Sequence, residues 1–281
     1  MKRVLATMLM LGFCTVALAQ EKEVTNIKTE TQPVSCGWDL LNNWNVSDAS
    51  TLPPAHVHLR MRYNWVTSEK PANNDDENDD HQLTPAIVWG IDEYWEWAVS
   101  VPYWFSEDGQ DRPGELDGNW DTFSTLQWRF MEQDGCLPAM AVATTLRIPT
   151  GDESNKVDLE GRLILTNQYD SGIRSHINAF AVSVNGDNDE NARHFQWGFV
   201  VGIDGPLNDD NTFRWVADYM HRSSYNYGRG NVNQLELGWE WHIDDQNALG
   251  MSVQLGLDGE DDGINAGIGM VYSHSLGMGS S

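Results

Sequence analysis

The sequence predicts an all-β protein: an antiparallel, up-and-down transmembrane β-barrel of about 12 strands. Three observations predict this fold. Apolar and polar residues alternate in about a dozen segments, long and short connections alternate between those segments, and aromatic residues gather near the segment ends. Because successive side chains of a strand point to opposite faces, a barrel strand in a membrane has one lipid-facing and one lumen-facing set. Hydropathy averaged along the chain does not register such strands, since only every second residue is apolar.

The N-terminus reads as a secretory signal over residues 1–19. Lys2 and Arg3 precede an apolar run, and Ala17-Leu18-Ala19 supplies a small-residue cleavage site. Residues 20–54 have no sustained period. We expect them to form an N-terminal periplasmic arm, partly disordered, that ends at Pro53-Pro54.

The whole chain carries a net charge of −25, and loss of a signal with two basic residues and no acidic ones takes it to near −27. This charge excludes nucleic acid as a partner and argues against electrostatic docking on an anionic membrane surface. The expected partners are therefore outer-membrane lipid, a small-molecule solute and the barrel-assembly machinery.

The predicted barrel covers residues 55–274, and a tail of 275–281 follows. Its first strand, 55–66, alternates without a slip, with Val57, Leu59 and Met61 on one face and His58 and Arg60 on the other. Further strands are predicted at 82–91, 94–105, 119–133, 137–149, 157–169, 172–185, 194–204, 212–224, 233–243, 247–258 and 263–274. Segment 172–185 switches its apolar face partway, which predicts a β-bulge near Ala179.

The connections indicate an orientation. With the N-terminus in the periplasm, the outward connections are the long ones and the periplasmic turns are short, apart from 205–211. The aromatic residues then form two girdles, one near each rim. A soluble β-sandwich gives no reason for either pattern.

Residues 139–183 resemble a known family. A strand that ends in Leu-Arg-Ile-Pro-Thr-Gly at 146–151 is followed by an acidic loop, a second strand, a short turn and a strand that opens near a histidine. This resembles the outer-membrane channels of the "MetA-pathway of phenol degradation" family, and the closing strand at 264–272 is also similar. The resemblance covers the mature barrel and implies an outer-membrane transporter for small solutes, some of them aromatic. This chain departs from the usual pattern in its acidity and in its small polar tail.

The polar face of the strands is the candidate functional site, and no catalytic residue is predicted. One interpretation is an arginine-lined constriction that favours anionic or polar aromatic solutes. The other is a network of ion pairs that fills the interior of a structural barrel. The predicted pore-lining residues are Arg60, Arg62, Glu96, Arg129, Arg147, Arg162, Arg174, Arg214, Glu236 and Glu240.

Other chemistry is less well supported by the sequence. His56 and His58 share a face but have no further ligand fixed nearby, so neither a metal nor a cofactor is predicted. His221, Ser223 and Asn233 lie on the lipid-facing side near one rim, and outer-membrane phospholipase A is similar in kind. A phospholipase-like enzyme is therefore an alternative to the channel.

Two cysteines remain after signal removal, Cys36 in the arm and Cys136 in a periplasmic turn. We expect a disulfide between them in this oxidising compartment. Closing a loop of about 100 residues is worth up to roughly 4–5 kcal/mol in the chain-entropy model.

Overall fold

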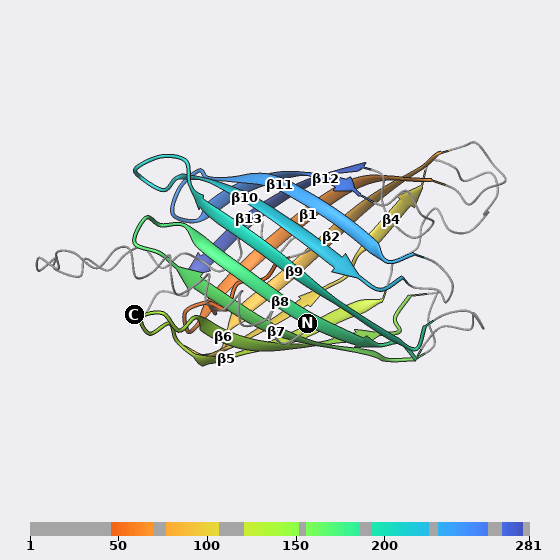
Figure 1. Cartoon of the computed structure of the whole chain (residues 1–281), viewed down its shortest axis with the longest axis horizontal. Coiled ribbons are helices and arrows are strands. Elements are labelled where there is room, and N and C mark those ends of the chain that lie inside the picture. Colours follow the sequence, from red (N-terminus) through yellow and green to blue (C-terminus); the bar gives the residue numbers. More distant parts are fainter. Residues whose placement is uncertain are drawn as a thin grey trace, which may run out of the picture.

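The computed structural model describes residues 46–69, 77–106, 121–151, 156–185, 193–224, 230–257 and 266–277. These residues form one antiparallel sheet, which closes because β1 pairs with both β2 and β13 (Figure 1). The strand segments are β1 (His56–Glu69), β2 (Glu77–Gly90), β3 (Trp95–Ser100), β4 (Tyr103–Ser106), β5 (Thr122–Met131), β6 (Ala139–Ile148), β7 (Asp158–Gln168), β8 (Arg174–Ser183), β9 (Phe195–Pro206), β10 (Phe213–Arg222), β11 (Val232–His242), β12 (Asn247–Gly256) and β13 (Ala266–Gly277).

Segments β3 and β4 are two halves of one barrel strand, since both pair with β2. The strand is interrupted at Pro102, which has no N–H to donate to the ladder. The preceding Val101 still donates its N–H to Pro85 O at 3.2 Å. The described residues thus form a closed barrel of 12 strands, which confirms the predicted fold class.

The two faces of the sheet differ as the alternation predicts. Along β1, Leu59 and Met61 are exposed on the outside, whereas His58, Arg60 and Asn64 are buried on the inside. Leu237, Val253 and Ile268 repeat the outward pattern on β11, β12 and β13. An outer surface that exposes apolar side chains while the interior holds charged ones suits a barrel surrounded by lipid. No helix within the described ranges is long and apolar enough to cross a membrane.

Because consecutive strands are antiparallel, successive connections belong alternately to the two ends of the barrel. At the end we call the turn end, strands are joined by 91–94, 132–138, 169–173, 207–212 and 243–246. At the opposite end, the loop end, they are joined by 70–76, 107–121, 149–157, 184–194, 223–231 and 257–265. The loop-end connections are the longer set, as the sequence predicts.

Aromatic side chains ring the outer surface. Near the turn end, Trp95 stacks on Trp128 with ring centroids 5.5 Å apart and planes 10° apart. Near the loop end, Phe195 and Trp197 are exposed. Other exposed aromatic residues of the outer surface are Trp89, Trp97, Tyr103, Phe130, Trp239, Trp241 and Tyr272. Aromatic side chains at these depths match the two interfaces of a membrane.

The predicted bulge near Ala179 is wrong. Strand β8 pairs with β7 and β9 in unbroken register through Ala179. The apparent change of face has another cause: Phe180 is an apolar residue on the inner face, with the Arg162 guanidinium 5.0 Å from its ring centroid. The register shift in this sheet lies instead in β5, between Arg129 and Met131. Strand β13 also continues to Gly277, beyond the predicted boundary at 274.

Candidate functional site in the barrel lumen

A non-strand stretch, residues 46–54, lies inside the barrel, and we call it the luminal segment. Val46, Ala49 and Leu52 are fully buried, and Asp48 is 2% exposed. This stretch is the end of the predicted periplasmic arm, and here it packs against the inner wall. Residues 1–45, which include the predicted signal and Cys36, lie outside the described residues.

Two glycines of the inner wall leave room for the luminal segment. A Cβ at Gly90 would lie 2.2 Å from Pro53 O and 2.6 Å from Leu52 O, too close for any other residue without movement of the backbone. A Cβ at Gly202 would lie 3.0 Å from a methyl group of Val46. The inner wall is therefore shaped around this segment.

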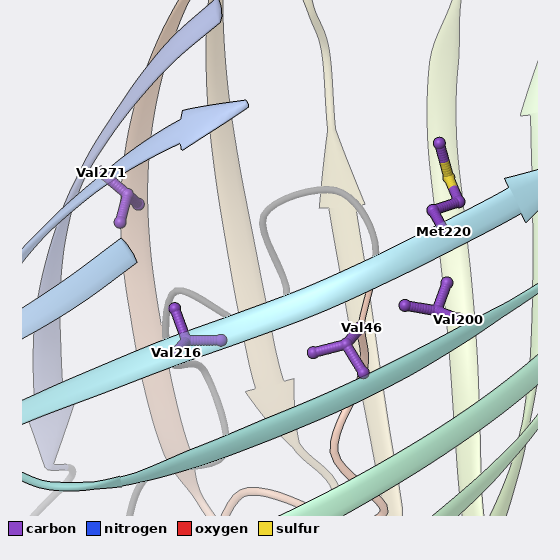
Figure 2. Packing of buried hydrophobic residues seen from close by; sticks show 5 residues of the cluster. All are labelled: Val46, Val200, Val216, Met220 and Val271. Carbon is purple, nitrogen blue, oxygen red and sulfur yellow. The ribbon is translucent and has the colours of Figure 1, made fainter. Parts of the chain in front are cut away.

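Apolar contacts hold the segment at two places. Val46 belongs to a buried cluster with Val200, Val216, Met220 and Val271, from β9, β10 and β13 (Figure 2). Ala49 belongs to a second cluster of small wall residues. Those residues are Ala141, Ala143 and Ile164, from β6 and β7. The segment thus touches walls on different sides of the lumen.

Wall side chains also bind the backbone of the segment. Asn178 accepts the Ser47 N–H at 2.5 Å and donates to Ser47 O at 3.0 Å. Thr166 Oγ1 accepts the Ala49 N–H at 2.9 Å, and Glu96 Oε2 accepts the Leu52 N–H at 3.0 Å. These bonds supply the partners that buried peptide groups require in the absence of a strand ladder.

Asp48 is the charged centre of the contact. Its Oδ2 lies 2.6 Å from Arg174 Nη1. Arg174 Nε also donates to both oxygens of Asp204, at 3.1 and 3.0 Å. Asp204 in turn pairs with Arg214 and with His176 Nε2, the latter at 2.7 Å. Two arginines, one histidine and two carboxylates therefore form one buried network on the turn-end side of the lumen.

Opposing effects act on the Asp48 carboxyl, which belongs to no strand. Burial would raise its pKa because a charged form is poorly solvated inside the barrel. Arg174 and His176, together with the Ser50 N–H bond to Oδ1 at 2.9 Å, outweigh burial and hold the pKa of Asp48 below its usual value. Asp48 is therefore an ionised partner of Arg174 at neutral pH.

The structure distributes the sequence-predicted pore-lining residues over three levels. Arg147 pairs with Asp121 at 2.7 Å near the loop end, and Arg162 pairs with Glu160 at 2.9 Å. Arg174 and Arg214 share the network just described. The other predicted residues also lie on the inner face: Arg60, Arg62 and Glu96 on β1 and β3, Arg129 beside Glu132 near the turn end, and Glu236 and Glu240 on β11.

Sequence reasoning missed several members of this site. His176 lies two residues after Arg174 on β8, and Asp204 lies four residues after Val200 on β9, so each shares the inner face of its strand with that residue. The strand period alone therefore predicts that both side chains point into the lumen. Asp48 had no such signal, because the arm lacks a period and its partner Arg174 is 126 residues away in the chain.

The lipid-facing His221 and Asn233 do meet, with His221 Nδ1 2.7 Å from Asn233 Oδ1. Ser223, however, is 2% exposed, and its hydroxyl oxygen accepts the Trp197 N–H at 3.0 Å. Asn233 also accepts the Tyr219 hydroxyl at 2.5 Å. The structure therefore joins two of the three proposed groups and directs the serine to the barrel backbone.

Two further points of the sequence analysis concern metal ligation and the cysteines. In the part of the chain that the structure describes, no group of three or more His, Cys, Asp or Glu residues is placed to hold a metal ion. Cys136 is exposed and has no disulfide to a described residue. Since Cys36 lies outside those ranges, the Cys36–Cys136 pairing stays a prediction.

Comparison with known proteins shows likeness in fold. An outer-membrane channel from Pseudomonas putida F1 superposes with a TM-score of 0.61 at 12% identity, over 82% of this chain and 98% of that one. The NanC porin gives 0.54 at 8% identity, over 78% and 100% of the two chains. The KdgM porin gives 0.50 at 10% identity, over 78% and 99%. No family model matches the chain, and no curated protein matches it.

The closed barrel and its apolar outer surface define the class: the chain is a membrane-spanning β-barrel protein, and its fold is similar to that of these outer-membrane channels. At identities this low the likeness extends to the fold alone. In this chain, the lumen holds the luminal segment and the buried charge network that binds it.

Proposed function

We propose that the protein is an outer-membrane channel for the passive uptake of small solutes, aromatic and anionic ones among them. The observation that carries the proposal is the contrast between the two faces of a closed barrel. The outer face exposes apolar side chains, whereas the inner face gathers charged and amide side chains at every level. A path for hydrated solutes needs such a polar interior.

The resemblance of residues 139–183 to the "MetA-pathway of phenol degradation" family supports aromatic solutes. Lumen arginines suit the same class, because a guanidinium stacks on aromatic rings and pairs with carboxylates. Arg60 and Arg62 lie next to each other on the inner face of β1, away from the network around Asp204. Replacing both with alanine should lower the flux of benzoate more than that of a neutral sugar.

We place the turn end in the periplasm, because short periplasmic turns and long outer loops are usual in such barrels. Delivery by the predicted signal peptide and insertion by the barrel-assembly machinery belong to the same proposal. A Cys36–Cys136 disulfide would then tie the arm to the turn end. Identical gel mobility with and without reductant, together with two titratable thiols, would refute that bond.

A second candidate function rests on the luminal segment. A barrel whose lumen is filled by residues 46–54 and by ion pairs is a structural protein if the segment never leaves. No chemical step belongs to either candidate, and a phospholipase is disfavoured by the contacts of Ser223.

Swelling of liposomes that contain the purified full chain tests the choice. The wild type should admit a small neutral sugar and sodium benzoate slowly. The Gly90→Ala variant should admit both several-fold faster, because the new methyl group displaces Leu52 and Pro53. Gly161→Ala is the matched control, since a Cβ there meets nothing within 4 Å. Absence of swelling with all three proteins would contradict the channel and favour the structural barrel.

A further inference from the structure

The lumen wall binds the luminal segment in the way a binding site holds a ligand. Residues 46–52 are not part of the β-ladder and are held by side chains of the wall. Asn178 uses both its amide oxygen and its amide nitrogen on the peptide groups of Ser47. Gln127 donates to Asp48 O at 3.2 Å and to Ser50 O at 2.9 Å.

The arginines at this place attract an anion. Arg174 and Arg214 both pair with the Asp204 carboxylate, and Arg174 also pairs with Asp48 at 2.6 Å. A guanidinium this deeply buried is costly unless negative groups compensate its charge. Asp48 is one of the groups that compensate Arg174.

Contacts within the wall hold the binding groups in place. Asp204 accepts both bonds from Arg174 Nε and thereby orients the guanidinium toward the lumen. His176 is 1% exposed and bridges Asp204 and Thr166, with its Nδ1 3.1 Å from Thr166 Oγ1. Thr166 Oγ1 is the atom that accepts the Ala49 N–H. The groups that bind the carboxylate and the neighbouring amide are thus linked through one histidine.

We propose that Arg174, Thr166, Asn178 and Gln127 form a solute-binding site for a carboxylate joined to an amide, the chemistry of a short acidic peptide or an N-acylated amino acid, and that Asp48 occupies this site as an internal ligand. The inference rests on the proposed channel function, since it names the solute class that competes with the luminal segment. An arriving solute of this class replaces the bonds of Asp48 and its flanking amides and so exchanges with the segment.

The test uses the full chain with Gly90→Ala and Asp48→Ala, in detergent, and two peptide probes. One probe is acetyl-Val-Ser-Asp-Ala-Ser-amide, the sequence of residues 46–50, and the other has asparagine in place of aspartate. Calorimetric titration should show the aspartate probe binding at least tenfold tighter than the asparagine probe. Adding Arg174→Gln should abolish that preference, and the wild type should bind the aspartate probe at least tenfold more weakly because its site is occupied. Equal binding of the two probes, or a preference that survives Arg174→Gln, would overturn the proposal.

A second measurement applies if the double variant does not fold. In a chain with Thr51→Cys, Cys36→Ser and Cys136→Ser, excess aspartate probe should accelerate thiol labelling at position 51, and the asparagine probe should not. Equal acceleration, or none with either probe, would overturn the proposal. Neither measurement depends on transport. If the barrel binds the probe but passes no solute, the binding site is supported and the channel function is refuted. If the barrel conducts but does not bind the probe, the channel function is supported and the binding site is refuted.

Discussion

Replacing Arg174 with glutamine should release the luminal segment from the wall. We call the luminal segment seated when it is bound to the wall and released when it is not. In the seated state this change leaves Asp48, 2% exposed, without the guanidinium that lies 2.6 Å away. Removing one partner of a buried ion pair costs about 3–5 kcal/mol. The loss of the Arg174–Asp204 contact affects the seated and released states alike, so it largely cancels. Of these two contacts of Arg174, the one with Asp48 is present in the seated state and absent in the released state.

At about 1.4 kcal/mol per factor of ten, this cost raises the ratio of released to wall-bound segment by about 10²-fold at the lower limit and about 4 × 10³-fold at the upper limit. The assay is the rate of maleimide labelling of a cysteine at position 51, in a chain with Cys36→Ser and Cys136→Ser. Thr51 is 8% exposed, so a thiol there reacts only when the segment is released. Labelling should accelerate by at least about 100-fold in the Arg174→Gln background.

The matched control is Arg147→Gln. Arg147 also lies on the inner face and pairs with a buried carboxylate, Asp121, but it does so near the loop end. Labelling at position 51 should change little in this background. Equal labelling rates for the two arginine variants would refute the reasoning, because the seat of the segment would then not depend on the Asp48–Arg174 contact.

Three further predictions follow from the same structure. Val201→Lys, on the outer face, should lower the free energy of unfolding in lipid by about 2–4 kcal/mol. Thr84→Lys, on the inner face, should lower the same free energy by less than about 1 kcal/mol. Denaturant titration of the two variants measures the difference. Trp95→Ala should lower that free energy by at least about 0.5–1.5 kcal/mol through loss of its stacking on Trp128, and an unchanged midpoint would contradict the girdle. Because the carboxyl of Asp48 has a lowered pKa when the segment is bound to the wall, binding is favoured above the ordinary value of 3.8 and weakens as pH falls below it. Since only the thiolate reacts with maleimide, the labelling rate at position 51 is divided at each pH by the rate of a free thiol. This ratio should be constant from pH 7 to about 5 and should rise below about 4, and a constant ratio throughout would contradict the assigned charge state.

Local periodicity accounts for what the sequence could predict. The alternation of β1 and its successors predicts both the sheet and the face that each side chain occupies, because in a barrel every strand has one wet and one apolar side. It therefore also predicts that the arginines lie inside. The same rule misled at Phe180, where an apolar side chain lies inside and its ring packs against the guanidinium of Arg162.

The luminal segment could not be predicted in this way. Its conformation depends on contacts with distant residues, among them Ser47 with Asn178 and Asp48 with Arg174, each more than 100 residues away in sequence. Gly90 lies within the predicted strand 82–91, where the strand period gives it no special role, yet in the structure it makes room for Pro53. Such contacts leave no periodic trace along the chain.

The most direct test of the central claim is the single-channel current of the full mature chain in a planar bilayer, compared with its Gly90→Ala variant. The account predicts brief, infrequent openings in the wild type and longer openings of the same or larger conductance in the variant. The Gly161→Ala protein should behave as the wild type does. Silent bilayers with folded, inserted Gly90→Ala protein would contradict the account and identify the molecule as a sealed structural barrel.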